Sequence, residues 1–281
     1  MKLPNSLAIG VFAYNRPSHL RRVLISLENY KISPSKNIYL FLDGPRNYKD
    51  KILQREIALM SKYNPYMKIK LKKSKENKGL AKAITSGIDF LSKRYKNVII
   101  LEDDCIPRKE FFLFVFKLLK KKKFSENFGL ICGYQFPEIQ RLKDKIIYPM
   151  VFKYFIPWGW CVNSKYWKDY RKKVLITKKN ISLKNKLAEK IKKLTLHKKG
   201  QIWSLNFILY NLFIKRKIIF PNKSLIKNIG FDGSGINSSI TDKFNTFYRK
   251  TKKISANKII ENKKLQKKQL LILSKTFKYF Y

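Results

Sequence analysis

Three adjacent carboxylates interrupt a chain that otherwise contains few acids. Glu102, Asp103 and Asp104 follow an apolar run in the stretch NVIILEDDCIP. Alternate side chains of a strand share a face, so residues 102 and 104 are expected to point the same way and to bind a divalent cation through oxygen. Such a metal can bridge a diphosphate and stabilise it as it leaves in a group transfer. The alternative is a solvated acidic turn that neighbouring lysines neutralise.

Other polar residues follow apolar runs in the same way. Asp43, in FLDGP, can accept a hydrogen bond from a base or ribose, or it can form an Asx-type turn before Gly44. Asn15 and Arg16 end the first run, where Arg16 can grip phosphate or stack on a base, or simply lead into a helix at Pro17. The sequence contains neither GxGxxG after the first strand nor GxxxxGK[ST], so metal and side chains would have to meet the phosphate charge.

Alternating strands and helices are predicted to position these residues. The predicted strands cover 7–14, 37–44, 67–74, 97–101 and 129–136, and the helices cover 17–30, 50–63, 80–94 and the segment after Pro107, which suits a first helical turn. Strand 67–74 alternates apolar and basic residues, as an edge or half-exposed strand would, whereas strand 97–101 is wholly apolar and is expected to be central. This order predicts an α/β fold with a mostly parallel, doubly wound sheet, helices on both faces and a ligand site at the carboxyl ends of the strands.

The charge of the chain is extreme. Lys and Arg number 63 against 18 Asp and Glu, which gives a net charge of +45. Such a surface attracts nucleic acid or anionic lipid, although AT-rich coding would produce the same excess of lysine without a ligand. With 281 residues, of which 44% are hydrophobic, disorder of the whole chain is excluded.

The cysteines, histidines and apolar runs restrict the cellular compartment and the kinds of metal, disulfide and membrane segments that the chain can have. Cys105, Cys132 and Cys161 are widely spaced and form no CxxC pair, which predicts a reducing compartment with neither a zinc knuckle nor a disulfide framework. His19 and His197 are isolated in the sequence and are expected to be structural or surface residues. No signal peptide is expected from MKLPNSLAIGVFAYN, and no segment approaches the ~18 apolar residues of a transmembrane helix.

Six sequence pieces, in this order, carry a resemblance to a known family. They are LAIGVFAYNRPSHLRRVLISL, LFLDGP, NKGLAKAITSGIDFL, VIILEDDCIPRKEFFLFV, PWGWCVNSKYW and IIFPNKSLIKNIGFDGSG. Over residues 7–236 the chain resembles GT-A glycosyltransferases, above all bacterial proteins of glycosyltransferase family 2, and more distantly the N-acetylglucosaminyltransferase I type. The resemblance implies a GT-A fold with a nucleotide-sugar-binding half (1–136), an acceptor-binding half (137–242) and a basic C-terminal tail (243–281).

The resemblance also implies roles for individual residues. Asp104 matches the direct ligand of Mn²⁺ or Mg²⁺, with Glu102 and Asp103 near the ribose or metal-bound waters. The remaining matches are Asp43, which reads the base, Asn15 and Arg16, which line the nucleotide pocket, and Asn77 and Gly79, which form the NxG turn beside the donor.

The acceptor side is less complete. Trp158, Gly159 and Trp160 match an acceptor-side loop whose aromatic faces can stack on sugar rings, and plain core packing is the alternative for the tryptophans. Relatives carry a general base near the tryptophan of GQIWSLNF, where this chain has only Gln201, Ser204 and Asn206. An inverting transfer still needs a proton acceptor, and Asp232 in NIGFDGSG is the candidate.

The leading hypothesis is therefore a metal-dependent, inverting glycosyltransferase. It would move a sugar from a nucleoside diphosphate donor, expected to be a UDP-sugar, to a glycan or lipid-linked acceptor in cell-surface polysaccharide or lipopolysaccharide synthesis. We expect it in the cytoplasm, with peripheral attachment to the anionic inner face of the membrane, and nucleic acid is not an expected partner. The alternatives are an inactive GT-A scaffold and a basic nucleic-acid-binding protein.

Overall fold

A nine-stranded sheet forms the centre of the chain in a computed structural model, in the order β13-β8-β10-β6-β9-β4-β1-β2-β3. The structure describes residues 4–30, 37–64, 67–121, 124, 127–180, 189, 203–235, 240–246, 251 and 253–276. The strands of this sheet are β1 (Leu7–Ala13), β2 (Ile38–Leu42), β3 (Ile69–Lys73), β4 (Asn97–Glu102), β6 (Leu130–Cys132), β8 (Pro149–Phe152), β9 (Trp160–Asn163), β10 (Ile218–Pro221) and β13 (Ile260–Glu261). Two short pairs lie outside it, β5 (Cys105–Pro107) with β11 (Ile226–Asn228) and β7 (Ile146–Ile147) with β12 (Lys253–Ile254).

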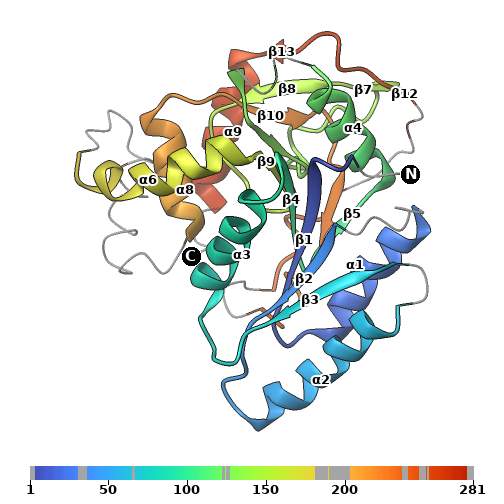
Figure 1. Cartoon of the computed structure of the whole chain (residues 1–281). Helices are drawn as coiled ribbons and strands as arrows, with labels where there is room; N and C mark the ends of the chain where they lie inside the picture. The colour runs from blue at the N-terminus through green and yellow to red at the C-terminus, as the bar shows by residue number, and fades with distance from the viewer. Residues whose placement is uncertain are drawn as a thin grey trace.

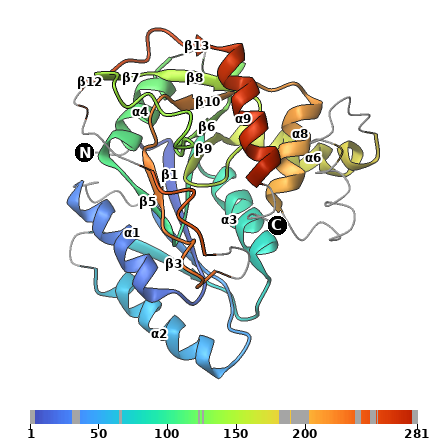
Figure 2. The same ribbon diagram turned by 180° about the vertical axis from the view of Figure 1, so that it is seen from behind.

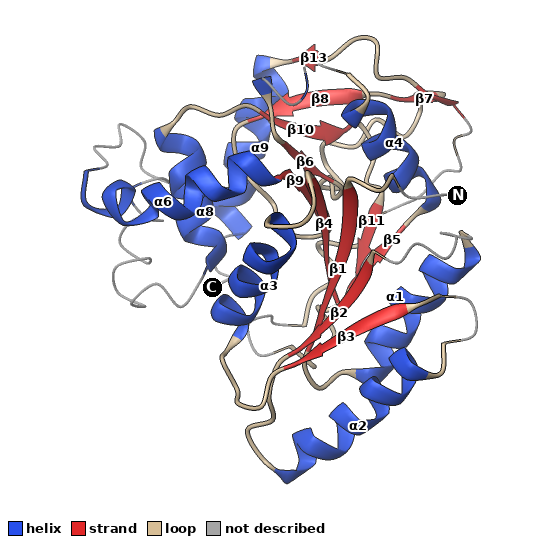
Figure 3. Cartoon of the chain, in the orientation of Figure 1, coloured by secondary structure: helices blue, strands red, loops and turns tan. Residues whose placement is uncertain are grey.

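Helices cover both faces of the sheet, as predicted (Figures 1 and 2). They are α1 (Pro17–Asn29), α2 (Tyr48–Lys62), α3 (Leu80–Ser92), α4 (Lys109–Leu119), α6 (Ser164–Asn180), α8 (Trp203–Phe213) and α9 (Lys263–Thr276). Helices α1 and α2 lie on one side of strands β1, β2 and β3, and α3, α6 and α8 lie together on the other (Figure 3).

The first four strands form the parallel part of the sheet. Strand β1 pairs in parallel with β2 and β4, and β2 pairs in parallel with β3. Strand β3 is the edge, and the apolar strand β4 is buried between β1 and β9, so both predictions are confirmed. Beyond β4 the sheet is mixed, because β9 enters antiparallel between β4 and β6. The strand predicted over 129–136 is shorter than expected and covers only Leu130–Cys132.

The expectation that Pro107 begins a helix is wrong. Pro107 ends β5, which pairs antiparallel with β11 from near the other end of the chain, and α4 begins only at Lys109. The carbonyl of Pro107 accepts a hydrogen bond from the Ser26 hydroxyl at 2.5 Å, and the N–H of Arg108 donates to Leu225 at 2.9 Å. A local pattern cannot reveal this distant partner strand, whose position places the loop after β11 directly beside the acidic triplet.

Part of the segment expected to be a tail from residue 243 is built into the fold. Strand β12 pairs with β7, and β13 extends the main sheet by pairing in parallel with β8. Helix α9 lies against β8, with Gln269, Ile272 and Leu273 buried. Residues 277–281 and most of the lysine-rich segment 178–199 lie outside the described residues.

An aromatic cluster fills the core between β9 and helices α6 and α8. The ring of Trp160 is fully buried and stacks on Trp203, with ring centroids 5.6 Å apart. The three cysteines are buried free thiols, and burial raises the pKa of each above its usual value. Within the described part of the chain, every helix is too short or too polar to cross a bilayer.

Candidate functional site

The predicted site residues gather where the parallel strands end. Strands β1, β2 and β4 run side by side in register, so the residues that follow Ala13, Leu42 and Leu101 reach one edge of the sheet. Arg16, Asp43 and the triplet therefore share the edge at which an α/β sheet binds ligands. The location of the site was thus predictable from the order of the strands.

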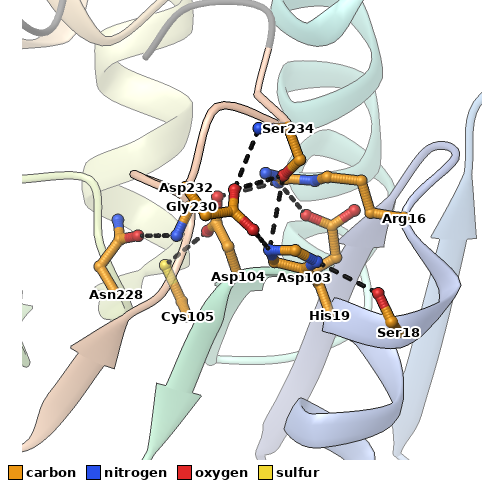
Figure 4. A network of polar contacts seen from close by, with 10 residues as sticks. All are labelled: Arg16, Ser18, His19, Asp103, Asp104, Cys105, Asn228, Gly230, Asp232 and Ser234. Atoms are coloured by element: carbon orange, nitrogen blue, oxygen red, sulfur yellow. Dashed lines mark hydrogen bonds and ion pairs between the residues drawn. The ribbon is translucent and has the colours of Figure 1, made fainter. Parts of the chain in front are cut away.

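Arg16 is the partner of two acids of the triplet, Asp103 and Asp104 (Figure 4). Its Nη2 atom contacts Oδ1 of Asp103 and lies 2.8 Å from Oδ2 of Asp104. Asp103 and Asp104 thus share the guanidinium, at the point where β4 has ended at Glu102 and the chain turns. The expected metal between residues 102 and 104 stays a prediction. The neutralising residue is an arginine from the end of β1, and not one of the many lysines.

Burial changes the proton affinity of this cluster. Burial, with the charges of Asp104 and Asp103, raises the pKa of Glu102 to about 8. Burial also raises the pKa of Asp103 to about 6, although Arg16 opposes the shift. Burial alone would lower the pKa of Arg16, but Asp104 and Asp103 raise it overall. One arginine therefore does not offset the negative charge that three ionised carboxylates would carry, and Glu102 is mostly protonated at neutral pH.

The carboxylates fit a metal that is shared with a ligand. Carboxylate oxygens suit Mn²⁺ and Mg²⁺, which commonly take one or two protein carboxylates and complete their shell with phosphate oxygens and water. Among the described residues, no group of three or more acids, histidines and cysteines is arranged to hold a metal by itself. Asp104 is thus a candidate ligand that such a cation would share with phosphate oxygens and water.

A second group of predicted residues meets at the end of β2. Oδ1 of Asp43 accepts hydrogen bonds from the N–H groups of Gly44 and Lys78, each at 2.9 Å, and Asn77 donates to the carbonyl of Gly44 at 2.8 Å. Gly79, with φ at +73°, caps the start of α3. The structure thus brings Asp43, Asn77 and Gly79 together. The carboxylate of Asp43 joins the loop after β2 to the start of α3 through Lys78, and does not form the Asx-type turn with the residue two positions on. Base reading by Asp43 stays a prediction.

Asn15 bonds to an acid that the sequence reasoning missed. Its Nδ2 donates to Oδ1 of Asp50 at 2.7 Å, and the hydroxyl of Tyr14 and Nε of Arg46 contact Oδ2. Burial opposes ionisation, but the hydrogen bonds from Tyr14, Asn15 and Arg46 prevail and lower the pKa of Asp50 to about 2. Asn47 could have indicated the position of Asp50 in the first turn of α2, because an Asn is a typical N-cap residue. Its side chain accepts a hydrogen bond from the N–H of Asp50, three residues later.

A loop after β11 lies beside Asp104 (Figure 4), and we refer to residues 229–235 as the covering loop. The N–H of Ile229 donates to the carbonyl of Asp104 at 2.9 Å, and the N–H of Gly230 donates to Oδ1 of Asn228 at 2.8 Å. A Cβ atom on Gly230 would lie 2.1 Å from Oδ2 of Asp104. Only glycine permits this close approach of the loop to the carboxylate.

The covering loop carries Asp232, the predicted base, to His19. Nε2 of His19, a buried residue of α1, lies 3.1 Å from Oδ2 of Asp232. Oδ1 of Asp232 accepts from the N–H of Ser234 at 3.0 Å and from its hydroxyl at 2.6 Å. His19 is therefore not isolated as expected, because tertiary folding brings it beside the predicted base; His197 lies outside the described residues.

The tryptophans lie deeper than an exposed acceptor platform would. Trp160 is fully buried, so core packing describes its position. Trp158 is 7% exposed and packs edge-on against Tyr134, Phe231 and Phe244. Since Phe231 belongs to the covering loop, Trp158 supports that loop from beneath. Sugar contact by these tryptophans stays a prediction.

Gly159, between the two tryptophans, is restricted by a close contact. Gly159 has φ at +62°, and a Cβ there would lie 2.5 Å from Ile226.

The stretch GQIWSLNF contains the positions at which a general base was sought. On α8, Ser204 and Asn206 are buried, and Gln201 lies outside the described residues. Oδ1 of Asn206 is buried without a hydrogen-bond partner in the described structure. Neither described position of this stretch offers a carboxylate.

The comparisons with known proteins agree with this architecture. Residues 8–179, more than half of the chain, match the sequence model described as Glycosyl transferase family 2. No curated protein gives a significant match. The matches do not test the more distant likeness to N-acetylglucosaminyltransferase I.

Two solved structures are also similar to the chain. One is a mannosyltransferase from Pyrobaculum calidifontis in complex with GDP-Man and Mn²⁺, with 12% identity, a TM-score of 0.41, and coverage of 58% of this chain and 46% of that one. The other, from Bacillus anthracis, is described as a glucose-1-phosphate thymidylyltransferase in complex with a sucrose. It shows 11% identity, a TM-score of 0.37, and coverage of 59% of this chain and 75% of that one. The chain thus spans about half the length of the mannosyltransferase.

Proposed function

The chain belongs to glycosyltransferase family 2 and has the GT-A fold, and from this premise we propose that it is a metal-dependent, inverting glycosyltransferase. The observation that carries the proposal is the meeting of Arg16, Asp103 and Asp104 at the ends of β1 and β4, beside Asp43 at the end of β2. This edge offers a cation site for a diphosphate and an acid for a nucleotide base. Asp104 would hold the Mn²⁺ or Mg²⁺, with Glu102 and Asp103 nearby.

Different residues of the chain bind different parts of the donor. Arg16 binds the diphosphate, and Asp43 reads the base or ribose from its fixed position in the turn with Asn77 and Gly79. Asn15, held by Asp50, fixes the chain where β1 passes into α1. The metal, when bound, supplies positive charge to the leaving diphosphate.

Asp232 acts as the proton acceptor. The acceptor hydroxyl oxygen forms a bond to the anomeric carbon while the bond from that carbon to the phosphate oxygen breaks, and the electron pair leaves with the nucleoside diphosphate. The hydroxyl proton passes to the carboxylate of Asp232. Ser234 and His19, with burial opposing them, lower the pKa of Asp232, so the carboxylate is ionised at neutral pH and able to take that proton.

The proposal also covers the identities of the donor and the acceptor. We propose a UDP-sugar donor and a glycan or lipid-linked acceptor in the synthesis of cell-surface polysaccharide or lipopolysaccharide, with Trp158 and Gly159 on the acceptor side. The enzyme would work in the cytoplasm, where its net charge of +45 holds it against the anionic inner face of the membrane.

A thermal-shift panel tests the proposal. Nucleoside diphosphates and their sugar conjugates are added with and without Mn²⁺ to the wild type, to Asp104→Asn and to Glu56→Gln, which removes an exposed acid paired with Arg21. A ligand at about 100 times its Kd adds roughly 2.7 kcal/mol of stability. We expect a metal-dependent shift with one nucleotide family in the wild type and Glu56→Gln, and its loss in Asp104→Asn.

Other outcomes overturn the proposal in distinct ways. The absence of any shift on folded wild-type protein excludes the donor site. Strongly salt-dependent DNA or RNA binding that survives Asp104→Asn, together with no nucleotide shift, identifies a nucleic-acid-binding protein. Donor binding with no release of nucleoside diphosphate, in the presence of membranes and glycans, identifies an inactive scaffold.

A further inference from the structure

The cation beside Asp104 is part of the chain itself. Arg16 directs one nitrogen, Nη2, at both Asp103 and Asp104, and its side chain is only 17% exposed. Asp103 is 5% exposed and Asp104 is 15% exposed. The contact is therefore a largely buried pair and not a surface ion pair screened by solvent.

The oxygen that Arg16 contacts has little free space around it. Oδ2 of Asp104 has Arg16 at 2.8 Å, and Gly230 approaches so closely that a Cβ there would lie at 2.1 Å from the oxygen. The other oxygen, Oδ1, has the Sγ atom of Cys105 at 3.3 Å. A metal ion bound to Oδ2 would occupy the space that the Arg16 guanidinium now fills. Its positive charge would take the place of the charge of Arg16.

We propose that Arg16 is an exchangeable counter-ion, which occupies Asp103 and Asp104 until a diphosphate and a metal arrive together. Arg16 then transfers from Asp104 to the diphosphate, and the metal takes its place. This inference rests on the proposed function and adds a role that the donor site alone does not require. Its consequence is that metal and nucleoside diphosphate each bind weakly alone and strengthen one another.

Charge balance gives the physical reason. Metal alone must expel Arg16 from a buried pair and leave its charge without a partner, whereas a diphosphate provides that partner. A diphosphate alone must approach Glu102, Asp103 and Asp104 with no added cation to offset repulsion. The two ligands together leave less charge without a partner than either ligand alone.

The position of Arg16 permits the exchange without refolding. The residue lies at the junction of β1 and α1, where Pro17 already provides the first helical position and the Arg16 side chain makes no helix cap. Its long side chain can rotate while the backbone stays in place. The guanidinium can pair with two phosphate oxygens as readily as with carboxylates.

The experiment measures binding and not turnover. Binding of Mn²⁺ alone is followed by the electron paramagnetic resonance of free Mn²⁺, and binding of UDP and GDP, each with and without Mn²⁺, is followed by titration calorimetry. The proteins are the wild type, Arg16→Gln, Arg16→Lys and Arg21→Gln. Arg21 is the matched control because it lies in α1, the helix that Arg16 precedes, is 60% exposed and pairs with Glu56.

Arg16→Gln should change the affinities for metal and for nucleotide in opposite directions. Arg16→Gln should bind Mn²⁺ alone about tenfold more tightly than the wild type and should bind the nucleotide about tenfold more weakly, within the usual range of coupling between sites. Arg16→Lys keeps the charge and should leave the affinity for Mn²⁺ alone near that of the wild type. In the wild type, UDP or GDP should raise the affinity for Mn²⁺ about tenfold, and Arg21→Gln should behave like the wild type.

The results separate this inference from the proposed function. If the wild type binds Mn²⁺ and a nucleotide but Arg16→Gln leaves the affinity for Mn²⁺ alone unchanged or weaker, the counter-ion role is wrong and the donor site stands. If Arg16→Gln does not fold, independent binding of Mn²⁺ and nucleotide to the wild type overturns the inference, and mutual strengthening with unchanged Mn²⁺ affinity in Arg16→Lys supports it. If no protein binds either ligand, the proposed function itself fails.

Discussion

Nε2 of His19 lies 3.1 Å from Oδ2 of Asp232, so a helix near the start of the chain holds a carboxylate from the covering loop. The other oxygen of that carboxylate is fixed by Ser234. Both oxygens of the proposed base therefore have defined partners. Two residues from Asp232, the same loop touches Asp104 at Gly230, which places the base next to the proposed donor site.

Two substitutions of His19 distinguish positioning from simple packing. The amide nitrogen of glutamine can replace Nε2, whereas that of asparagine lies closer to the position of Nδ1. We expect His19→Gln to retain most of the wild-type kcat and His19→Asn to lose up to about 100-fold, because misplacing a reacting group by about 1 Å costs that much. Release of nucleoside diphosphate from the donor found in the thermal-shift panel measures kcat and KM.

Asp232→Asn provides the reference for this series. It removes the proton acceptor and should lower kcat by about 100-fold or more while the KM for the donor changes little. Full activity in Asp232→Asn would show that another group is the base. Equal losses in His19→Gln and His19→Asn, on proteins of equal thermal stability, would assign His19 a packing role only.

Gly230→Ala should disrupt the site from the opposite side. The added methyl would lie 2.1 Å from Oδ2 of Asp104, so either the carboxylate or the covering loop must move. We expect a loss of about 1 to 3 kcal/mol in the free energy of unfolding, as for other overpacked positions, and loss of the metal-dependent nucleotide shift. Urea unfolding and the thermal-shift panel measure the two effects, and an unaltered nucleotide shift would contradict the close contact.

The fold and half of the site were predictable, and the reasons differ between residues. The apolar runs 7–14, 37–44 and 97–101 predicted the parallel strands, because a continuous apolar run is typical of a strand that is buried on both faces. Their carboxyl ends then located Arg16, Asp43 and Asp104. The pairing of β5 with β11, by contrast, joins segments distant in sequence and leaves no local signal.

Long-range contacts account for the misplaced residues. His19 looked isolated because its partner Asp232 arrives only when the covering loop folds beside Asp104. Trp160 belongs to the core because β9 enters the sheet between β4 and β6, which no periodicity in PWGWCVN indicates. Sequence reasoning identified the chemically distinctive residues but not which of them touch.

Trp160 should contribute to stability through apolar packing. It is fully buried against Trp203, Phe155 and Phe207, and its Nε1 has no hydrogen-bond partner in the described structure. Trp160→Ala should cost about 3 to 5 kcal/mol, and Trp160→Phe clearly less, because no hydrogen bond is lost and much of the ring volume remains. Urea unfolding measures both, and near-wild-type stability of Trp160→Ala would contradict the core position.

Asp50 should make folding more sensitive to acid. Its pKa falls from the ordinary value of 3.8 to about 2 in the folded chain. A carboxylate with a lowered folded pKa stabilises the fold above its unfolded pKa, and this contribution is lost as the pH falls from about 4 to about 2. At pH 7 the shift corresponds to about 2 kcal/mol, so Asp50→Asn should be less stable than the wild type by about that amount.

The pH dependence separates this charge effect from a loss of packing. Urea unfolding at pH 7 and pH 3 should show that the difference between wild type and Asp50→Asn shrinks by roughly half at pH 3, because Asp50 is then partly protonated in the unfolded chain. Glu56→Gln, which removes an exposed acid on the same helix, should change stability by less than about 1 kcal/mol at either pH. A difference for Asp50→Asn that is the same at both pH values would show that the side chain acts through shape alone, and that the hydrogen bonds from Tyr14 and Asn15 do not favour its ionised form.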